Sequence, residues 1–322
     1  MKKKKIKILC TLGPSSLNKK FLSFAKGKVN LLRLNMSHIE INNLKKIIFF
    51  LKKNSKIPIC IDTEGAQIRT KVNKTILYKK NQKFKIYLNK GNFNIYPREI
   101  FKKIKTKDIL DIGFSGLVAQ VIKVKKDYLS LKTTSQGLLE NNKGVHLKNR
   151  TIKLNFLTQK DFKAIKIAKK LKIKNFALSF TNSVDDMKKF KNILASENKI
   201  YKIETRKAIK NINSIVKNGE QFLIDRGDLS KETSLEEIPL IQRNIFNVSK
   251  KYKNKKVFVA TNLLESMMYN NYPTRGEAND IFSSLEMGAS GLVLAAETAI
   301  GKFPIEAINF LNKIIKSFLK NK

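Results

Sequence analysis

The chain contains no tryptophan and only two cysteines and two histidines among its 322 residues. Cys10 and Cys60 both fall inside apolar stretches, where a cysteine packs as a small hydrophobic residue. We therefore expect neither a disulfide nor a cysteine metal site. His38 has no second histidine or cysteine beside it in the sequence. A hydrogen-bonding role is therefore a better interpretation of His38 than metal binding.

Long apolar runs are also missing. No uninterrupted stretch approaches the roughly 20 apolar residues that a membrane-spanning helix needs. The basic start, Met1–Lys5, leads directly into an apolar strand pattern and lacks the features of a signal peptide. The sequence therefore predicts a cytoplasmic protein with no membrane partner.

Acidic residues are scarce, because 25 aspartates and glutamates stand against 66 lysines and arginines, a formal net charge of +41. A charge this high is often typical of nucleic-acid binding. The lysines are spread over the whole chain, however, and do not gather in one stripe. We therefore expect no nucleic-acid partner, although the diffuse positive field would attract small phosphorylated anions.

What the sequence does contain is a series of short apolar runs that each end in a polar, charged or hydroxyl residue. Continuous β-branched and aliphatic runs of this length are typical of parallel strands buried on both faces. The runs are Ile6–Thr11, Val29–Asn35, Pro58–Thr63, Asn175–Phe180, Ile200–Glu204, Gln221–Arg226, Val257–Thr261 and Gly291–Glu297. Most are followed by helical periodicity, so the pattern predicts an α/β fold, a (β/α)8 TIM barrel, with its active site at the carboxyl ends of the strands.

The third run is followed by a different pattern. Between residues 71 and 150, short alternating runs separated by glycines indicate antiparallel strands. The sequence thus predicts a barrel domain of residues 1–70 and 151–322 and an inserted β-barrel lid domain of residues 71–150. The expected barrel helices are Leu17–Lys26, Ile39–Lys53, Thr158–Leu171, Ser183–Leu194, Arg206–Lys217, Ile238–Tyr252, Glu277–Met287 and Pro304–Leu319.

Lys202 and Glu204 lie two residues apart at the end of the fifth run, so their side chains share one face of a strand. Burying both charges is costly unless they are paired. One interpretation is a structural ion pair. The other is that Lys202 contacts a substrate phosphate beside a metal-binding Glu204. Gly227 and Asp228 follow the next run, where the glycine allows close approach of a ligand and Asp228 would be a second carboxylate for Mg²⁺.

Arg33 and several oxygen donors follow the second and third runs. Arg33 suits bidentate phosphate binding. The donors, which together would suit a monovalent cation, are Asn35, Ser37, Asp62 and Thr63. Each of these alone is more commonly a cap or turn residue. Thr261 ends the seventh run, where its hydroxyl could relay a proton through water, although alone it is an ordinary strand residue.

These segments resemble the pyruvate kinase family along nearly the whole chain. Leu32–His38 resembles the family's ARLNFSH, Asp62–Thr70 its DTKGPEIRT, Lys202–Glu204 its KIEN and Arg226–Leu229 its ARGDLG. Ile8–Ser16 resembles the family's first strand and turn, Ala260–Met267 its ATQMLESM, Pro273–Glu277 its PTRAE and Glu297–Pro304 its GETAxGKYP. The matching segments occur in the same order as in the family.

The resemblance implies phosphoryl transfer from phosphoenolpyruvate to ADP, giving pyruvate and ATP in the last step of glycolysis. It implies that Arg33 and Lys202 meet the substrate phosphate, and that backbone N–H groups around Gly227 and Asp228 meet its carboxylate. Glu204 and Asp228 would hold Mg²⁺ or Mn²⁺. Thr261 would help to protonate the enolate.

The resemblance also implies a potassium site and a nucleotide site. The potassium site would consist of Asn35, Ser37, Asp62 and Thr63. The nucleotide would contact Asn35, His38, Arg69 and Lys143, with the inserted domain as a lid. Gln67 stands where the family has a glutamate linked to potassium dependence, so that dependence stays open. The sequence departs from the family pattern at other positions as well. Glu64 stands where the family has a lysine, and Asn262 stands where it has a glutamine. A segment that contains DDGL in the family is replaced here by Gly113-Phe114-Ser115-Gly116-Leu117.

The resemblance further implies a short form that lacks the family's C-terminal regulatory domain, and it leaves a homo-oligomer through the barrel faces open. Two alternatives remain at this point. One is a related phosphoenolpyruvate or pyruvate barrel enzyme with a different acceptor. The other is a catalytically silent barrel that acts as a binding protein.

Overall fold

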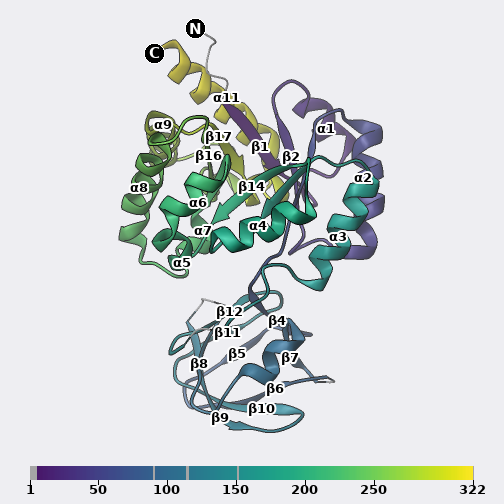
Figure 1. Ribbon diagram of the computed structural model, residues 1–322, viewed down its shortest axis with the longest axis vertical. Coiled ribbons are helices and arrows are strands. Elements are labelled where there is room, and N and C mark those ends of the chain that lie inside the picture. The colour runs from purple at the N-terminus through teal and green to yellow at the C-terminus, as the bar shows by residue number, and fades with distance from the viewer. Residues whose placement is uncertain (1–5, 90, 114–115, 151, 322) are drawn as a thin grey trace. The chain divides into compact units, whose positions relative to one another are not determined.

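A computed structural model describes residues 6–89, 91–113, 116–150 and 152–321 (Figure 1). Parallel strands close into a barrel in the order β1-β17-β16-β15-β14-β13-β3-β2. They are β1 Lys7–Thr11, β2 Leu31–Asn35, β3 Ile59–Asp62, β13 Asn175–Leu178, β14 Asn198–Ile203, β15 Gln221–Asp225, β16 Lys256–Ala260 and β17 Gly291–Leu294. Phe114, Ser115 and Met1–Lys5 lie outside the described residues.

The barrel strands form because their residues are apolar on both faces. Every residue of β3 and of β17 is buried. One buried cluster collects side chains from seven of the barrel strands, namely Leu9, Cys60, Ala177, Ile200, Leu223, Phe258, Ala260 and Val293. The predicted (β/α)8 barrel is therefore confirmed, and Cys10 and Cys60 are buried free thiols.

Helices connect the barrel strands and lie around them (Figure 1). The longer ones are α1 Lys19–Ala25, α2 Ile41–Asn54, α3 Gln159–Lys170, α4 Val184–Ile193, α5 Arg206–Lys210, α6 Ile212–Asn218, α8 Ile238–Lys250, α9 Arg275–Met287 and α11 Pro304–Lys320. Single turns are α7 Arg226–Leu229, α10 Ala296–Ala299, η2 Leu235–Glu237 and η3 Glu265–Met268. The prediction of one helix over Arg206–Lys217 is wrong. Asn211, with ψ of 11°, separates α5 from α6, and its side-chain amide donates to Asn182 O at 2.8 Å.

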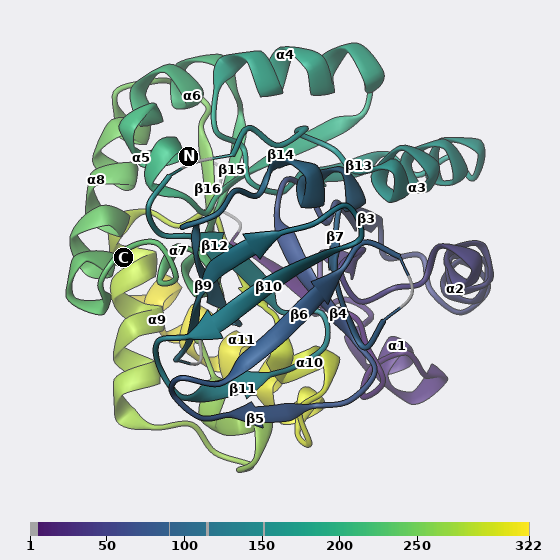
Figure 2. The ribbon, with the colours of Figure 1, turned by 90° about the horizontal axis from the view of Figure 1, so that it is seen from below.

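The segment after β3 forms antiparallel sheets, as predicted for an all-β insertion. Its elements are β4 Ile68–Val72, β5 Ile76–Tyr78, β6 Lys83–Tyr87, β7 Phe93–Tyr96, η1 Arg98–Lys103, β8 Ile109–Ile112, β9 Leu117–Val124, β10 Tyr128–Thr133, β11 Gly137–Leu139 and β12 Gly144–Leu147. Seven strands form one sheet in the order β6-β10-β9-β8-β12-β4-β7, and β11 pairs with β5. Figure 2 shows β10 between β6 and β9.

The chain divides into two compact units. A barrel unit contains residues 1–65 and 159–322, and an insertion unit contains residues 66–158. Strand β4 pairs with β7 and β12, so the insertion unit starts a few residues before the predicted boundary at residue 71. Within the described residues, no helix has both the length and the apolar character that crossing a membrane requires.

Candidate active site

Buried charged side chains gather where the barrel strands end. A soluble protein rarely buries such groups unless they are paired. The fully buried members are Arg33, Asp62, Lys202, Glu204 and Asp225. Arg33 lies in β2, Asp62 ends β3, and Lys202 lies in β14. Glu204 directly follows β14, and Asp225 ends β15. The expectation that chemistry-bearing residues meet at the carboxyl ends of the strands therefore agrees with where these five side chains lie.

Arg33 is held by its neighbours on both sides. Its Nε donates to Asp62 Oδ2 at 2.7 Å, and its Nη1 donates to Thr11 Oγ1 at 2.8 Å. Because β1, β2 and β3 are adjacent strands, Thr11 and Asp62 flank the guanidinium group. The arrangement fixes the orientation of Arg33 before any ligand arrives.

Lys202 stands at the centre of the buried charges. Its Nζ lies 2.6 Å from Glu204 Oε1, 3.2 Å from Asp225 Oδ2 and 3.5 Å from Asp62 Oδ2. It also donates to Ser179 Oγ at 3.2 Å. Burial alone would lower the pKa of Lys202, but the three carboxylates outweigh burial and raise it above its ordinary value. Lys202 is therefore a buried permanent cation.

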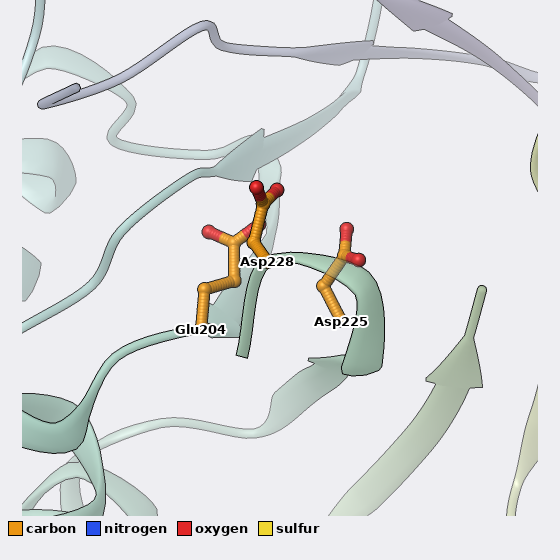
Figure 3. A group of neighbouring side chains, drawn as sticks. All are labelled: Glu204, Asp225 and Asp228. Atoms are coloured by element: carbon orange, nitrogen blue, oxygen red, sulfur yellow. The ribbon is translucent and has the colours of Figure 1, made fainter. Parts of the chain in front are cut away.

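Three carboxylates form a group that can hold a cation. One oxygen from each of Glu204, Asp225 and Asp228 lies within 4.8 Å of the others. Figure 3 shows the three side chains as a group of neighbours. Glu204 Oε2 accepts from Phe180 N at 2.5 Å. Among the described residues, the buried Glu204 Oε1 accepts no hydrogen bond of normal geometry, although Lys202 Nζ is close to it. A set of oxygen donors from three neighbouring carboxylates fits a hard divalent cation such as Mg²⁺ or Mn²⁺.

The charges of these carboxyl groups differ because their neighbours differ. Burial raises the pKa of Glu204 to about 8, although Lys202 opposes the rise. Burial would also raise the pKa of Asp225, but Lys202 and Arg33 lower it below its ordinary value. Asp228 is half-buried, and its Oδ1 contacts Lys231 Nζ at 2.6 Å. Lys202 and Arg33 therefore favour the ionised form of Asp225.

Thr261 lies just beyond β16 in a strained backbone conformation. Its φ is +68° and that of Asn262 is +54°, in the left-handed region that costs a non-glycine residue about 1–3 kcal/mol. The guanidinium group of Arg226 holds this turn by donating to Thr261 O at 2.7 Å and to Asp280. Gly227 N donates to Thr261 Oγ1 at 2.7 Å. The hydroxyl of Thr261 is thus placed beside Gly227 by the surrounding backbone.

The four predicted potassium ligands lie where β2 and β3 end. Asn35 and Asp62 are the last residues of these strands, and Ser37 and Thr63 lie in the loops that follow them. Asn35 and Asp62 are opposite each other in the register of these neighbouring strands. Asn35 Oδ1 accepts from Ser37 N at 3.0 Å, which is a turn contact. Thr63 O accepts from Ser179 Oγ at 2.6 Å. Asp62, in contrast, faces Arg33 and Lys202, so it belongs to the buried charge cluster as well.

The four predicted nucleotide contacts are divided between the two units. Asn35 and the exposed His38 belong to the barrel unit, where His38 N donates to Asn35 O at 3.1 Å. Arg69 and Lys143 belong to the insertion unit. Arg69 lies opposite Gly144 in the β4–β12 pairing, so Arg69 and Lys143 are neighbours.

The unexpected glutamate at position 64 has a local counter-ion. Glu64 is buried, and its Oε2 lies 3.2 Å from Lys160 Nζ. Lys160 Nζ also donates to Met36 O at 2.5 Å. The negative charge at this position is therefore compensated inside the barrel unit.

Sequence reasoning missed two residues of the cluster, Asp225 and Ser179. Asp225 contacts Lys202, and its Oδ1 accepts from Thr261 Oγ1 at 3.2 Å. Ser179 bonds to Asp62, Thr63 and Lys202. A signal for Asp225 was present, since an aspartate ends an otherwise apolar run. Ser179 carried no such signal, because a lone serine after a strand is common.

Comparison with known proteins places these residues in a family. The sequence profile of "Pyruvate kinase, barrel domain" matches residues 3–308. A pyruvate kinase of Methanocaldococcus jannaschii is 36% identical over 97% of this chain and 69% of its own length. A pyruvate kinase of Thermotoga maritima is 32% identical over 96% of this chain and 70% of its own length. Plastidial pyruvate kinase 2 of Arabidopsis thaliana is 30% identical over 97% of this chain, which spans 57% of the plant protein.

Proposed function

The chain belongs to the pyruvate kinase family, and on that premise we propose that it transfers the phosphoryl group of phosphoenolpyruvate to ADP. The observation that carries the proposal is the Lys202 ammonium group, buried at the barrel mouth between Glu204 and Asp225. In this reaction the bond between phosphorus and the enol oxygen breaks, and a bond to a β-phosphate oxygen of ADP forms. The enolate left behind takes up one proton at its terminal carbon and becomes pyruvate.

The buried cations would stabilise the phosphoryl group as it moves. Arg33 and Lys202 are fixed by neighbouring side chains, so little reorganisation is needed when negative charge develops. Glu204 and Asp228 would hold Mg²⁺ or Mn²⁺, which supplies charge neutralisation and polarisation of phosphoryl oxygens when bound. Gly227 and Asp228 would lie beside the substrate carboxylate.

Thr261 would serve the proton transfer. Its hydroxyl lies at the end of β16, bonded by Gly227 N and within 3.2 Å of Asp225 Oδ1. A hydroxyl at this place can pass a proton to the enolate through a water molecule. Asn35, Ser37, Asp62 and Thr63 would hold K⁺, and Asn35, His38, Arg69 and Lys143 would contact ADP.

The test is a coupled assay for pyruvate formation from phosphoenolpyruvate and ADP, with Mg²⁺ and with or without K⁺. We expect turnover in the parent chain, and a loss of about 10²–10³ in rate for Lys202→Met, because one electrostatic contact to the transferring group is removed. Asp185→Asn, a charge change on the surface of α4, is the matched control and should leave the rate unchanged.

Two results would contradict the proposal in different ways. Binding of phosphoenolpyruvate without any ADP-dependent pyruvate formation would indicate a different acceptor. Absence of phosphoenolpyruvate binding in the presence of Mg²⁺ would indicate that the barrel does not act on this substrate.

A further inference from the structure

The insertion unit is strongly basic. Residues 66–158 contain 21 lysines and arginines but only five aspartates and glutamates. Asp108 and Glu140, two of the five acidic residues, already pair with Arg150 and Lys143. A positive excess of this size attracts anions, and the positions of the charges on the fold decide which anion is bound.

Lysines from three neighbouring strands of this unit meet on one outer face. Along β6 and β10 the side chains alternate between the buried core and the outside, and Lys123 of β9 lies opposite Ser130 of β10. Figure 2 shows these strands side by side. The exposed and half-buried residues that we call the lysine–tyrosine face are Lys83, Lys85, Tyr87, Lys123, Tyr128 and Lys132. The pairing register creates this grouping, which the sequence alone does not show.

The lysines of this face repel one another. Lys83 and Lys132 lie directly opposite each other in the β6–β10 pairing. Like charges in such a pair destabilise a sheet. Among the described residues, the ion pairs of this unit, Lys143–Glu140 and Arg150–Asp108, include none of the lysines of the face. A bound polyanion would replace this repulsion by attraction, so the arrangement favours binding over stability.

Two tyrosines lie at one end of the same face. Tyr87 and Tyr128 are opposite each other in the β6–β10 pairing, and their ring centroids are 6.4 Å apart. Lys85 Nζ lies 4.3 Å from the centroid of the Tyr128 ring. The bases of an unpaired nucleic-acid strand stack on aromatic rings while cations follow its phosphates. The face therefore presents both kinds of group that bind a single strand.

A hollow adjoins the tyrosine end of the face. It has a volume of about 600 Å³ and is lined by Tyr87, Asn89, Arg98 and Asp127. Pockets of roughly 300–1,000 Å³ hold small ligands. The amide, guanidinium and carboxylate groups of this lining can form hydrogen bonds with the edge of an unstacked base. The hollow thus favours a nucleic acid over an acidic membrane, which would need only the lysines.

We propose that the lysine–tyrosine face binds single-stranded nucleic acid, with phosphates along the lysines and bases on the two tyrosines. Binding tolerates many sequences, because stacking and lysine contacts do not distinguish the bases. It weakens as salt rises, because counter-ions are released from the strand. The proposal departs from the expectation of no nucleic-acid partner, because that expectation treated the lysines as evenly spread.

Three variants of the full chain test the two parts of the face. Lys83→Gln with Lys132→Gln removes the opposed lysine pair. Tyr87→Leu removes one ring and keeps an apolar side chain. Lys163→Gln with Lys166→Gln removes the same charge from two exposed lysines about one turn apart on α3 of the barrel unit, and is the matched control.

Fluorescence anisotropy of a labelled oligothymidylate measures binding at several salt concentrations, and circular dichroism with thermal melting verifies that each variant is folded. We expect the Lys83 and Lys132 variant to lower the slope of log affinity against log salt by about 1.4, because each lost phosphate contact removes about 0.7 for a single strand. Tyr87→Leu should bind about tenfold more weakly with an unchanged slope, because stacking on one ring is lost. The control variant should keep an affinity and a slope close to those of the parent chain.

The inference is overturned if the control variant loses as much affinity as the lysine variant of the face, because binding would then depend on net charge alone. Unchanged affinity in folded Tyr87→Leu would also overturn it, because stacking is part of the proposal. Binding of vesicles that contain phosphatidylserine, without binding of the oligonucleotide, would assign the face to a membrane instead. Pyruvate formation is measured separately and should be unchanged in all three variants, so these outcomes do not bear on the proposed function.

Discussion

Lys202 stays charged inside the barrel because carboxylates surround it, and this mutual dependence has a consequence for stability. Asp62, Glu204 and Asp225 would each lose a counter-ion if the ammonium group were removed. Removing one partner of a buried ion pair typically costs about 3–5 kcal/mol. We expect Lys202→Met to lower the free energy of unfolding in urea by about this amount.

The double variant Lys202→Met with Asp225→Ala should recover part of that loss. It removes one of the carboxylates that Lys202→Met leaves uncompensated, so fewer buried charges lack a partner. Urea titrations of the parent chain, both single variants and the double variant give the coupling. Additive losses in the two single variants would contradict this account.

Gly227 is placed so that a side chain would displace Thr261. A Cβ atom added there would lie 3.3 Å from Thr261 Cγ2 and 3.4 Å from its Cβ. We expect Gly227→Ala to reduce turnover about tenfold or more, since small misplacements of reacting groups are costly, while thermal melting changes little.

Gly276 provides the matched control for that substitution. It lies in the first turn of α9, and an added Cβ would have only Thr274 Oγ1 at 3.9 Å among its near neighbours. Gly276→Ala should leave turnover unchanged and stabilise the protein by about 0.5–1 kcal/mol. Equal loss of turnover in both glycine variants would mean that contact with Thr261 is not the cause.

Sequence reasoning found most of the cluster because side chains at the ends of apolar runs are easy to recognise. Arg33, Asp62, Lys202 and Glu204 were all identified this way, and the structure brings them together. Asp225 was missed because the neighbouring Arg226-Gly227-Asp228 already offered a carboxylate, Asp228, at the end of the same strand. Its contact with Lys202 depends on the β14–β15 register, which sequence does not reveal.

At the scale of elements, the barrel strands were predicted to within a few residues. Their apolar character is strong because both faces are buried. The break between α5 and α6 was not predictable from periodicity, because the apolar spacing continues through Asn211. What breaks the helix is a tertiary contact of the Asn211 side chain with Asn182 O.

The insertion unit contains an ion pair that ties its sheet to the segment after β12. Arg150 Nε donates to Asp108 Oδ1 at 2.7 Å, and Lys105 N donates to Asp108 Oδ2 at 2.7 Å. Burial would raise the pKa of Asp108, but these hydrogen bonds outweigh burial and lower it. A lowered pKa means that the carboxylate stabilises the fold above its unfolded pKa of about 3.9. That contribution is lost as the pH falls through the folded value.

We expect Asp108→Asn to lower the free energy of unfolding by about 1.5–3 kcal/mol at pH 7, the usual worth of hydrogen bonds to a charged group. The difference from the parent chain should shrink as the pH falls below the ordinary aspartate range. Urea titrations monitored by circular dichroism at several pH values measure this. Asp127→Asn, an exposed position of the same unit, is the control. A difference that stays constant with pH would contradict the ion-pair explanation.

At the scale of the whole molecule, the barrel unit is interrupted in sequence but continuous in structure. The buried Asp161 accepts from Glu64 N at 2.8 Å and from Gly65 N at 3.1 Å. The side chain thereby joins the two points at which the chain leaves and re-enters the barrel unit. All three carboxylates of the proposed metal group belong to this unit.

We therefore expect the barrel unit to fold when a short Gly-Ser linker replaces residues 66–158. Mn²⁺ affinity should stay within a few-fold of the full chain, because its ligands are all retained, while pyruvate formation should be lost with Arg69 and Lys143. The same deletion with Asp161→Asn should melt at a lower temperature. Loss of Mn²⁺ binding in a folded deletion variant would show that the metal group needs the insertion unit.

The closing pair of the barrel sets the order in which the chain can fold. Lys7 of β1 pairs with Gly291 of β17, so closure of the barrel joins its first and last strands, which lie far apart in the sequence. Joining such distant segments slows folding, because loop-closure entropy is lost before the contact forms. During synthesis β1 can pair with β2 on one side, but its other edge stays unpaired until β17 has left the ribosome. Until then the unfinished barrel exposes an unpaired apolar strand edge, and such edges make a nascent chain prone to aggregation.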